Sequence, residues 1–220
     1  MSPHLIGIAL ALVLTSCQPA RVVRPTAMPV PAQQPAPAPE PEPVPESVPA
    51  PLTLPVANYR EGRTLKVFGQ EVHDRFNGFH AGDDIEVEDT STVVSVVAIA
   101  DGTVVLSRRV SGYGGVLVIR HTLGNGPDAE TVSALYGHLD LAGAPAVGER
   151  VRRGQQVATL GDHESAQTDG ERKHLHFQLW ADPGIQLAGY TATRAGLLAY
   201  LNPTTFFQTH GIAVPTTTAP

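Results

Sequence analysis

Residues 173–180 read Lys-His-Leu-His-Phe-Gln-Leu-Trp, an alternation of polar and apolar side chains. In a β-strand, successive side chains point to opposite faces of the sheet. We therefore expect His174 and His176 on one face, and a core on the other face formed by Leu175, Phe177 and Leu179. Neutral imidazole is a common metal ligand and a common general base. Alone, the pair also fits a half-exposed strand without chemistry, so a functional site requires further ligands elsewhere in the chain.

Length and composition limit the class of protein. The chain has 220 residues, enough for one sizeable domain with extensions, and a formal net charge of -6. Proteins that bind nucleic acid usually carry a basic patch or stripe, so we expect no nucleic-acid partner. The only cysteine is Cys17, which excludes an intramolecular disulfide.

The N-terminus has the pattern of a targeting segment. Leu5–Leu14 is an apolar run that is short for a membrane span, and Leu14-Thr15-Ser16-Cys17 follows directly. This ending resembles the lipobox of bacterial lipoproteins, in which the cysteine becomes lipidated. Residues 1–17 are then a lipoprotein signal peptide, and the resemblance implies lipidation of Cys17. The alternative is an ordinary signal peptide with an incidental cysteine, and no Lys or Arg precedes the run.

Residues 18–57 are rich in Pro, Ala and Glu. Proline at this density disfavours helix and sheet, so we expect a semi-rigid linker of the polyproline type. Its position after the lipidation motif favours a tether over disordered filler. Together the two segments predict a lipid-anchored protein of the bacterial cell envelope, on the periplasmic face of the outer or inner membrane, with the membrane as a partner through the anchor.

Residues 58–208 are expected to form one mainly β domain, and residues 209–220 a flexible tail. Short apolar or alternating runs are separated by Gly-rich turns, which is typical of β-strands. One or two helical turns are expected at Arg194–Leu201, ended by Asn202-Pro203. The expected strands are Thr64–Phe68, Asp84–Val87, Val93–Ala98, Gly102–Ser107, Val116–His121, Ser133–His138, Val157–Leu160 and His174–Trp180.

Two further stretches could supply chemistry. His80-Ala81-Gly82-Asp83-Asp84 places an imidazole and carboxylates around a turn, and both groups are zinc ligands. Tyr136-Gly137-His138-Leu139 places His138 at the end of an expected strand. Each stretch alone also fits a polar loop or a surface histidine.

Taken in order, these motifs closely resemble the lysostaphin-type zinc endopeptidases, the LytM-domain family, which cleave peptide bonds of peptidoglycan. The resembling residues also include Gly112-Tyr113-Gly114 and Val151–Val157, and they extend from about Phe68 to Phe206. The resemblance implies an antiparallel β-sheet domain with an open cleft and little helix.

The resemblance also assigns roles to individual residues. It implies one zinc ion per domain, held by His80, Asp84 and His176, with Asp83 as the main rival of Asp84 for the ligand role. His138 and His174 match the two unliganded catalytic histidines. We predict that His174 takes the proton of the attacking water and that His138 stabilises the oxyanion, although the two roles could be exchanged.

Other positions are less constrained. The loop 161–172, before the His-Leu-His motif, is longer and more charged than is usual in this family. Gln178 stands where Glu is common, and strand alternation allows it to orient a metal ligand or simply to be exposed. Arg75 and Tyr113 are weak candidates for substrate contacts.

The resemblance predicts zinc-dependent hydrolysis of cross-link or stem peptides of peptidoglycan by a membrane-tethered endopeptidase. The alternative is a non-catalytic LytM-type domain that binds a regulatory partner, namely a cell-wall hydrolase. Such domains usually lack zinc ligands, whereas all five key positions are filled here, which favours an enzyme.

Overall fold

A computed structural model describes residues 52–57, 59, 64–124 and 126–214, which all belong to one compact unit, Pro45–Pro220. The predicted signal peptide, Cys17 and residues 18–51 of the predicted linker lie outside the described residues, as does the end of the predicted tail. No helix within the described ranges is long and apolar enough to cross a membrane.

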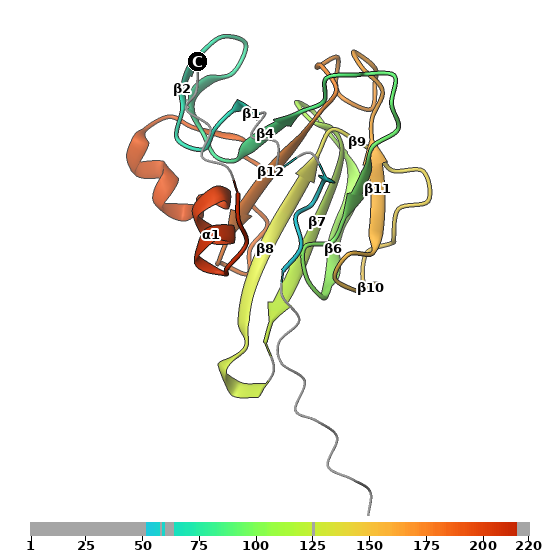
Figure 1. The fold of residues 1–220 in the computed structure, drawn as a ribbon. Coiled ribbons are helices and arrows are strands. Elements are labelled where there is room, and N and C mark those ends of the chain that lie inside the picture. The colour runs from blue at the N-terminus through green and yellow to red at the C-terminus, as the bar shows by residue number, and fades with distance from the viewer. Residues whose placement is uncertain (1–51, 58, 60–63, 125, 215–220) are drawn as a thin grey trace, which may run out of the picture. The chain divides into compact units, whose positions relative to one another are not determined.

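The largest sheet has seven strands, and every neighbouring pair is antiparallel (Figure 1). This arrangement confirms the prediction of a mainly β, antiparallel fold. From one edge to the other the strands are β1 (Thr64–Lys66), β4 (Asp83–Glu86), β12 (His174–Trp180), β8 (Glu130–Gly137), β7 (Gly114–Leu123), β6 (Gly102–Val110) and β10 (Arg150–Val151).

Two three-stranded sheets complete the β structure. One has the order β5 (Ser95–Val97), β11 (Gln156–Leu160), β9 (Leu139–Asp140). The other has the order β13 (Tyr190–Thr191), β3 (Asn77–His80), β2 (Glu71–His73), and it carries one metal-site candidate at the end of β3.

The helices are short: the 3-10 helices η2 (Gly126–Asp128) and η3 (Arg194–Ala199), and α1 (Pro203–Thr209). The helical turns expected at Arg194–Leu201 are present as η3, which ends before Asn202-Pro203, whereas α1, which begins at these two residues, was not expected. The Asn202 side chain accepts a hydrogen bond from the backbone N–H of Thr205, and Pro203 occupies the first turn of α1, where its missing N–H has no cost.

Strand β12 separates two apolar clusters. Leu175, Phe177 and Leu179 are completely buried in the larger cluster, as the alternation predicts. The opposite face carries His174, His176 and Gln178, and it ends at Trp180, which belongs to the second cluster. All seven residues of β12 are buried, so the histidine face is covered rather than half exposed.

The folded domain extends beyond both predicted boundaries. Leu52, Leu54 and Val56, assigned from the sequence to the linker, are buried in the larger cluster. Their segment is fastened by backbone hydrogen bonds from Thr53 N–H to Ile99 O (3.0 Å) and from Val97 N–H to Pro55 O (2.9 Å). At the other end, Val214 is buried in the same cluster, within the stretch predicted to be flexible. The alternating apolar residues Leu52, Leu54 and Val56 thus attach this Pro-containing segment to the folded domain.

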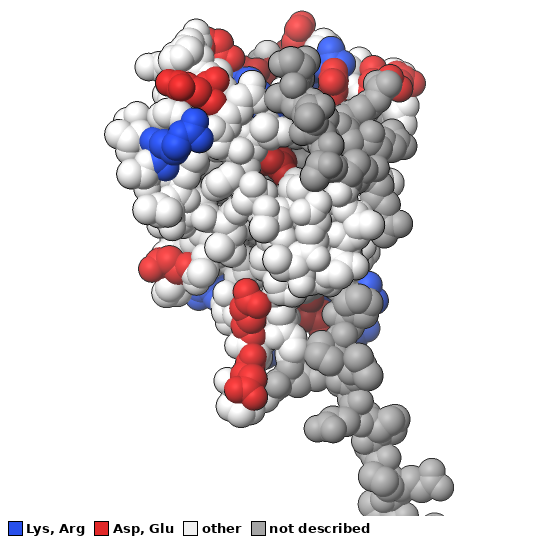
Figure 2. Space-filling model, turned by 60° about the vertical axis from the view of Figure 1, so that its left-hand side comes forward, with Lys and Arg blue, Asp and Glu red and all other residues white. Residues whose placement is uncertain are grey.

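Charged side chains lie mainly at the margins of the face shown in Figure 2, and its middle is mostly uncharged. Acidic and basic side chains are interspersed at the upper margin of this view, whereas a column of acidic side chains lies below.

Candidate metal centre and cleft

Strand register brings two of the proposed ligands together. β12 pairs with β4 so that His176 lies opposite Asp84, and directly opposed side chains on one sheet face are in contact range. His80 reaches the same point from the end of β3, through the tight turn at Ala81-Gly82. A Cβ atom at Gly82 would overlap the backbone carbonyl of Phe177, so only glycine allows this turn to lie against β12.

The three ligand atoms converge with a spacing that fits zinc. Asp84 Oδ1 lies 2.8 Å from His176 Nδ1 and 3.2 Å from His80 Nε2, and the two nitrogens are 3.1 Å apart. Ligands bound tetrahedrally to Zn²⁺ at about 2.0–2.1 Å are about 3.3 Å apart. His80, Asp84 and His176 also form the metal-ligating cluster found among the described residues, and all three are buried. The donor set, two imidazoles and one carboxylate, is one that zinc prefers.

Gln178 fixes the orientation of His176. Its side-chain nitrogen donates to the Gln186 carbonyl (3.3 Å), so its oxygen is left to accept from His176 Nε2–H (3.3 Å). With the proton on Nε2, His176 presents the Nδ1 lone pair toward Asp84 and His80. Gln178 is completely buried, which excludes the surface-exposed alternative.

Asp83, the rival of Asp84, points away from the metal-site candidate. Its carboxylate accepts hydrogen bonds from Tyr59 Oη (2.8 Å), Thr204 Oγ1 (3.0 Å) and the backbone N–H of Phe68 (2.9 Å). Neighbouring residues of a strand face opposite sides of the sheet, so Asp83 joins the N-terminal segment to α1 while Asp84 faces the histidines.

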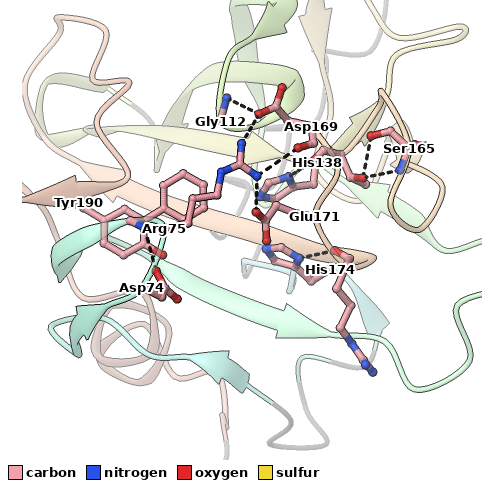
Figure 3. Close-up of polar contacts among 12 residues, drawn as sticks. Asp74, Arg75, Gly112, His138, Ser165, Asp169, Glu171, His174 and Tyr190 are labelled. Carbon is pink, nitrogen blue, oxygen red and sulfur yellow. Dashed lines mark hydrogen bonds and ion pairs between the residues drawn. The ribbon is translucent and has the colours of Figure 1, made fainter.

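His138 and His174 lie beside this cluster, with ring centroids 4.2 Å apart. His138 follows β8 with a positive φ of 61°, which turns its side chain into the cleft. Each Nδ1–H donates to a backbone carbonyl, that of Thr168 for His138 (3.1 Å) and that of Arg172 for His174 (2.5 Å) (Figure 3). Both rings therefore keep the Nε2 lone pair free, and His174 Nε2 lies 3.7 Å from Asp84 Oδ1.

Burial and neighbouring charges set the protonation states. Burial alone would raise the pKa of Asp84, but the charges of His80 and His174 and the hydrogen bonds from His176 and His80 hold this pKa well below its usual value. Burial lowers the pKa of His176, against the hydrogen bond to Asp84. Burial and the neighbouring His174 hold the pKa of His138 well below its usual value. The cluster thus combines an ionised carboxylate at Asp84 with an imidazole at His176 whose pKa is lowered toward the neutral form, and these are the forms that bind metal.

A cavity of about 210 Å³ opens beside these groups. Tyr113 lines it, and its ring lies 5.1 Å from that of His176 between centroids. The Tyr113 hydroxyl is buried and has no hydrogen-bond partner among the described residues. A buried donor without a partner is costly, so this hydroxyl is available to a ligand in the cleft. Other lining residues are Lys66, Phe76, Glu171, Leu187 and Tyr190.

Arg75 is engaged by the protein itself. Its Nη1 donates to Glu171 Oε1 (2.8 Å) and its Nη2 to Asp169 Oδ2 (2.9 Å), as Figure 3 shows. Asp169 Oδ2 also accepts from the backbone N–H of Gly112 (3.0 Å). In this arrangement the guanidinium joins the β2–β3 turn to loop 161–172, which differs from the predicted substrate contact.

The sequence did not indicate Thr168 or Arg172, because backbone carbonyls leave no signature in residue type. Lys66 and Tyr190 were also missed: Lys66 Nζ lies 3.2 Å from Tyr190 Oη and 3.1 Å from Asp74 Oδ2 at the rim of the cavity. The remaining histidines are outside the site, with His121 buried in the core and exposed positions for His73, His163 and His210.

Comparisons with known proteins identify related sequences and structures. Residues 78–186 match Peptidase family M23. The chain is 34% identical over 102 residues to the murein hydrolase activator EnvC of Escherichia coli (strain K12), a match that covers 46% of this chain and 21% of EnvC. The chain therefore spans about a fifth of the length of EnvC, since the match covers 21% of that protein.

Solved structures with a related fold include the catalytic domain of the antimicrobial peptidase lysostaphin from Staphylococcus simulans. It has a TM-score of 0.49 and 18% identity, over 68% of this chain and 95% of that one. A zinc containing peptidase from Vibrio cholerae has a TM-score of 0.39 and 24% identity, over 59% of this chain and 35% of that one. A chain of the SpoIIIAH and SpoIIQ complex has a TM-score of 0.49 and 20% identity, over 70% and 99% of the two chains.

Proposed function

Because residues 78–186 match peptidase family M23, we propose that this chain belongs to that family and is a zinc-dependent endopeptidase that hydrolyses peptide bonds of bacterial peptidoglycan. The observation that carries the proposal is the convergence of His80, Asp84 and His176 to within 2.8–3.2 Å, with His138 and His174 beside them.

His80, Asp84 and His176 would hold one Zn²⁺ through Nε2, Oδ1 and Nδ1. Three protein ligands leave a fourth position open, the arrangement of catalytic rather than structural zinc. The ion would supply Lewis-acid chemistry, lowering the pKa of water toward about 7 and polarising the scissile carbonyl. Gln178 would keep the His176 ring in the ligating orientation, a support that typically matters for metal affinity.

The two other histidines would move the protons. His174 holds its Nδ1 proton on the Arg172 carbonyl, so its Nε2 is free to accept the proton of the attacking water. His138 is oriented in the same way by Thr168, so its Nε2 could accept this proton in place of His174 or, once protonated, donate to the oxyanion. General acid–base assistance of this kind is typically worth about 10²–10⁴ in rate. The unpartnered Tyr113 hydroxyl would donate to the substrate within the cavity.

The second candidate function is that of a non-catalytic domain that binds and regulates a cell-wall hydrolase. It is favoured by one observation, the similarity to EnvC, which is described as a murein hydrolase activator. The complete set of five histidine and aspartate side chains favours the enzyme. A protein partner that modulates activity is compatible with both functions.

The proposed location is the bacterial cell envelope. The lipobox-like Leu14–Cys17 would attach the chain to a membrane through lipidated Cys17, and the Pro-rich segment would hold the domain at a distance from it. Such a tether would give the domain access to nearby peptidoglycan.

Incubation of the full-length chain with purified peptidoglycan sacculi tests the function directly. We expect new primary amines to be released, release to stop after a chelator is added, and zinc to restore it. If the zinc-loaded chain releases no amines but increases release by an added cell-wall hydrolase, the regulatory function replaces the enzymatic one.

A further inference from the structure

Two backbone carbonyls of one short segment orient the two histidines. Thr168 O accepts from His138 Nδ1 at 3.1 Å, and Arg172 O accepts from His174 Nδ1 at 2.5 Å. Both carbonyls belong to the loop before β12, and they lie only four residues apart in the sequence. The position of this segment therefore sets the direction of both rings.

Between the two carbonyls lie two carboxylates that are held by one side chain. Asp169 and Glu171 accept from Nη2 and Nη1 of Arg75 at 2.9 and 2.8 Å, and the Asp169 carbonyl also accepts from Nη1 at 3.4 Å. Figure 3 shows the Arg75 guanidinium between the two carboxylates. The planar fork of arginine can span two acceptors at fixed spacing, which the point charge of lysine cannot do.

Arg75 adds to the hydrogen bonds within the segment, such as Gly170 N–H to Ser165 O (2.8 Å) and Glu171 N–H to Thr168 O (3.1 Å). Asp169 has a positive φ of 54°, a backbone conformation that non-glycine residues rarely adopt, and Gly170 follows with a φ of 79°. Besides its contacts with Arg75, the Asp169 carboxylate accepts a hydrogen bond from the backbone N–H of Gly112 (3.0 Å), in the β6–β7 turn. Arg75 thus links the β2–β3 turn to loop 161–172, and Asp169 links the same loop to the β6–β7 turn.

We propose that Arg75 is a positioning residue for both His138 and His174, acting through Asp169 and Glu171 on the segment whose carbonyls orient the two rings. The expected change in turnover rests on the proposed peptidase function, whereas the expected change in the orientation of the two rings does not. It assigns Arg75 to the support of the proposed catalytic histidines, in place of a contact with substrate.

Substitution of Arg75 should disturb the orientation of His138 and His174 more than it lowers the free energy of unfolding. Arg75 is about half exposed, with 55% of its side-chain surface accessible, and exposed ion pairs contribute little to folding free energy. Misplaced proton-transfer groups, by contrast, reduce turnover strongly. We expect Arg75→Gln to lower kcat about tenfold, with KM within about twofold. Its melting temperature should stay within about 2 °C of wild type.

NMR of the zinc-loaded, full-length chain supplies a readout that does not require activity. In wild type the Nδ1 protons of His138 and His174 should be hydrogen bonded and protected from exchange. In Arg75→Gln both signals should broaden or disappear, and in Arg75→Lys they should be partly restored. If wild type shows no hydrolysis but Arg75→Gln still alters these signals, the positioning role stands while the peptidase function fails.

Asp74→Asn is the matched control, since Asp74 lies on the same turn but pairs with Lys66 at 3.1 Å rather than with the loop. An asparagine can still accept the hydrogen bond from Phe76 N–H (2.8 Å). We expect both ring signals to remain in this variant. Three results would overturn the proposal: retained ring signals and kcat in Arg75→Gln, higher turnover in Arg75→Gln, or equal loss in Asp74→Asn.

Discussion

At the scale of single residues, the site depends on which nitrogen of each histidine carries the proton. Thr168 and Arg172 hold the Nδ1 protons of His138 and His174, whereas Gln178 holds the Nε2 proton of His176. The proposed ligand and the proposed bases therefore present different ring atoms to the same cavity. This difference explains how two histidines on one strand face can have separate roles.

Replacement of Gln178 by Ala should weaken zinc binding about 10- to 100-fold, because His176 loses the acceptor that fixes its ring. Gln178→Glu keeps an acceptor and should bind zinc more tightly than Gln178→Ala. Competition with a chromophoric chelator measures both affinities. Gln208→Ala, which changes an exposed glutamine near the C-terminus, is the control. Equal zinc affinities for wild type and Gln178→Ala would contradict the orienting role.

Most side chains of the candidate site could be found from the sequence, since His80, Asp84, His138, His174 and His176 occur in a distinctive order. Their supports could not be found in this way. Thr168 and Arg172 act through backbone carbonyls, and the partner of Arg75 depends on how loop 161–172 folds back. The resemblance favoured Asp84 over Asp83 as the ligand, and strand register supports this choice by pairing His176 with Asp84.

At the scale of elements, the cleft depends on close contact between loop 161–172 and the start of β7. Gly114 has a φ of 71°, and a Cβ atom there would overlap the backbone carbonyl of Gln167, next to Thr168. Gly115 N–H donates to the same carbonyl at 2.9 Å. Gly114 thus allows the loop that orients His138 to lie directly on the sheet.

Gly114→Ala should therefore lower both stability and turnover, because the loop must move away from β7. Backbone strain of this kind typically costs about 1–3 kcal/mol, and the displaced contact adds to it. Gly124→Ala is a matched control, since Gly124 has a φ of 80° but open space around it. Urea unfolding and amine release from sacculi measure the two effects. A Gly114→Ala variant with the stability and turnover of Gly124→Ala would refute this account of the loop.

Long strands were easier to predict than short ones. β12 was predicted with its observed bounds, because its alternation is regular over seven residues. β2, β3 and β13 were not predicted, since strands of two to four residues carry too little pattern to separate them from loops. The pattern Asn202-Pro203 is compatible with the end of one helix and with the beginning of another. The helix that begins there, α1, buries Phe206 and Phe207 in the core, a contact that the sequence pattern alone did not indicate.

At the scale of the whole molecule, a chain of three hydrogen bonds runs through the buried core. Ile99 N–H donates to Tyr136 Oη (3.2 Å), Tyr136 Oη–H donates to His121 Nε2 (2.9 Å), and His121 Nδ1–H donates to Ala100 O (2.8 Å). His121 must be neutral for this chain to form. Burial lowers the pKa of His121 to about 4, against the hydrogen bonds to Ala100 and Asp101.

Stability should consequently fall as the pH falls. An unfolded histidine binds a proton below a pH of about 6.5, whereas folded His121 stays neutral until the pH reaches about 4. Between these values the unfolded state binds more protons, so the free energy of unfolding decreases with decreasing pH. From pH 7 to pH 5 the contribution of His121 amounts to about 2 kcal/mol. Urea unfolding of wild type and His121→Gln at both pH values isolates it, and equal losses in the two proteins would contradict the prediction.

The central claim, that His176 binds zinc and His174 acts beside it, is tested most directly by zinc content and turnover of two alanine variants of the full-length chain. His174→Ala should retain one zinc ion per chain and lose amine release from sacculi by about 10²-fold or more. His176→Ala should lose both the zinc and the activity. Full hydrolysis by His174→Ala, or full zinc content in His176→Ala, would contradict the account.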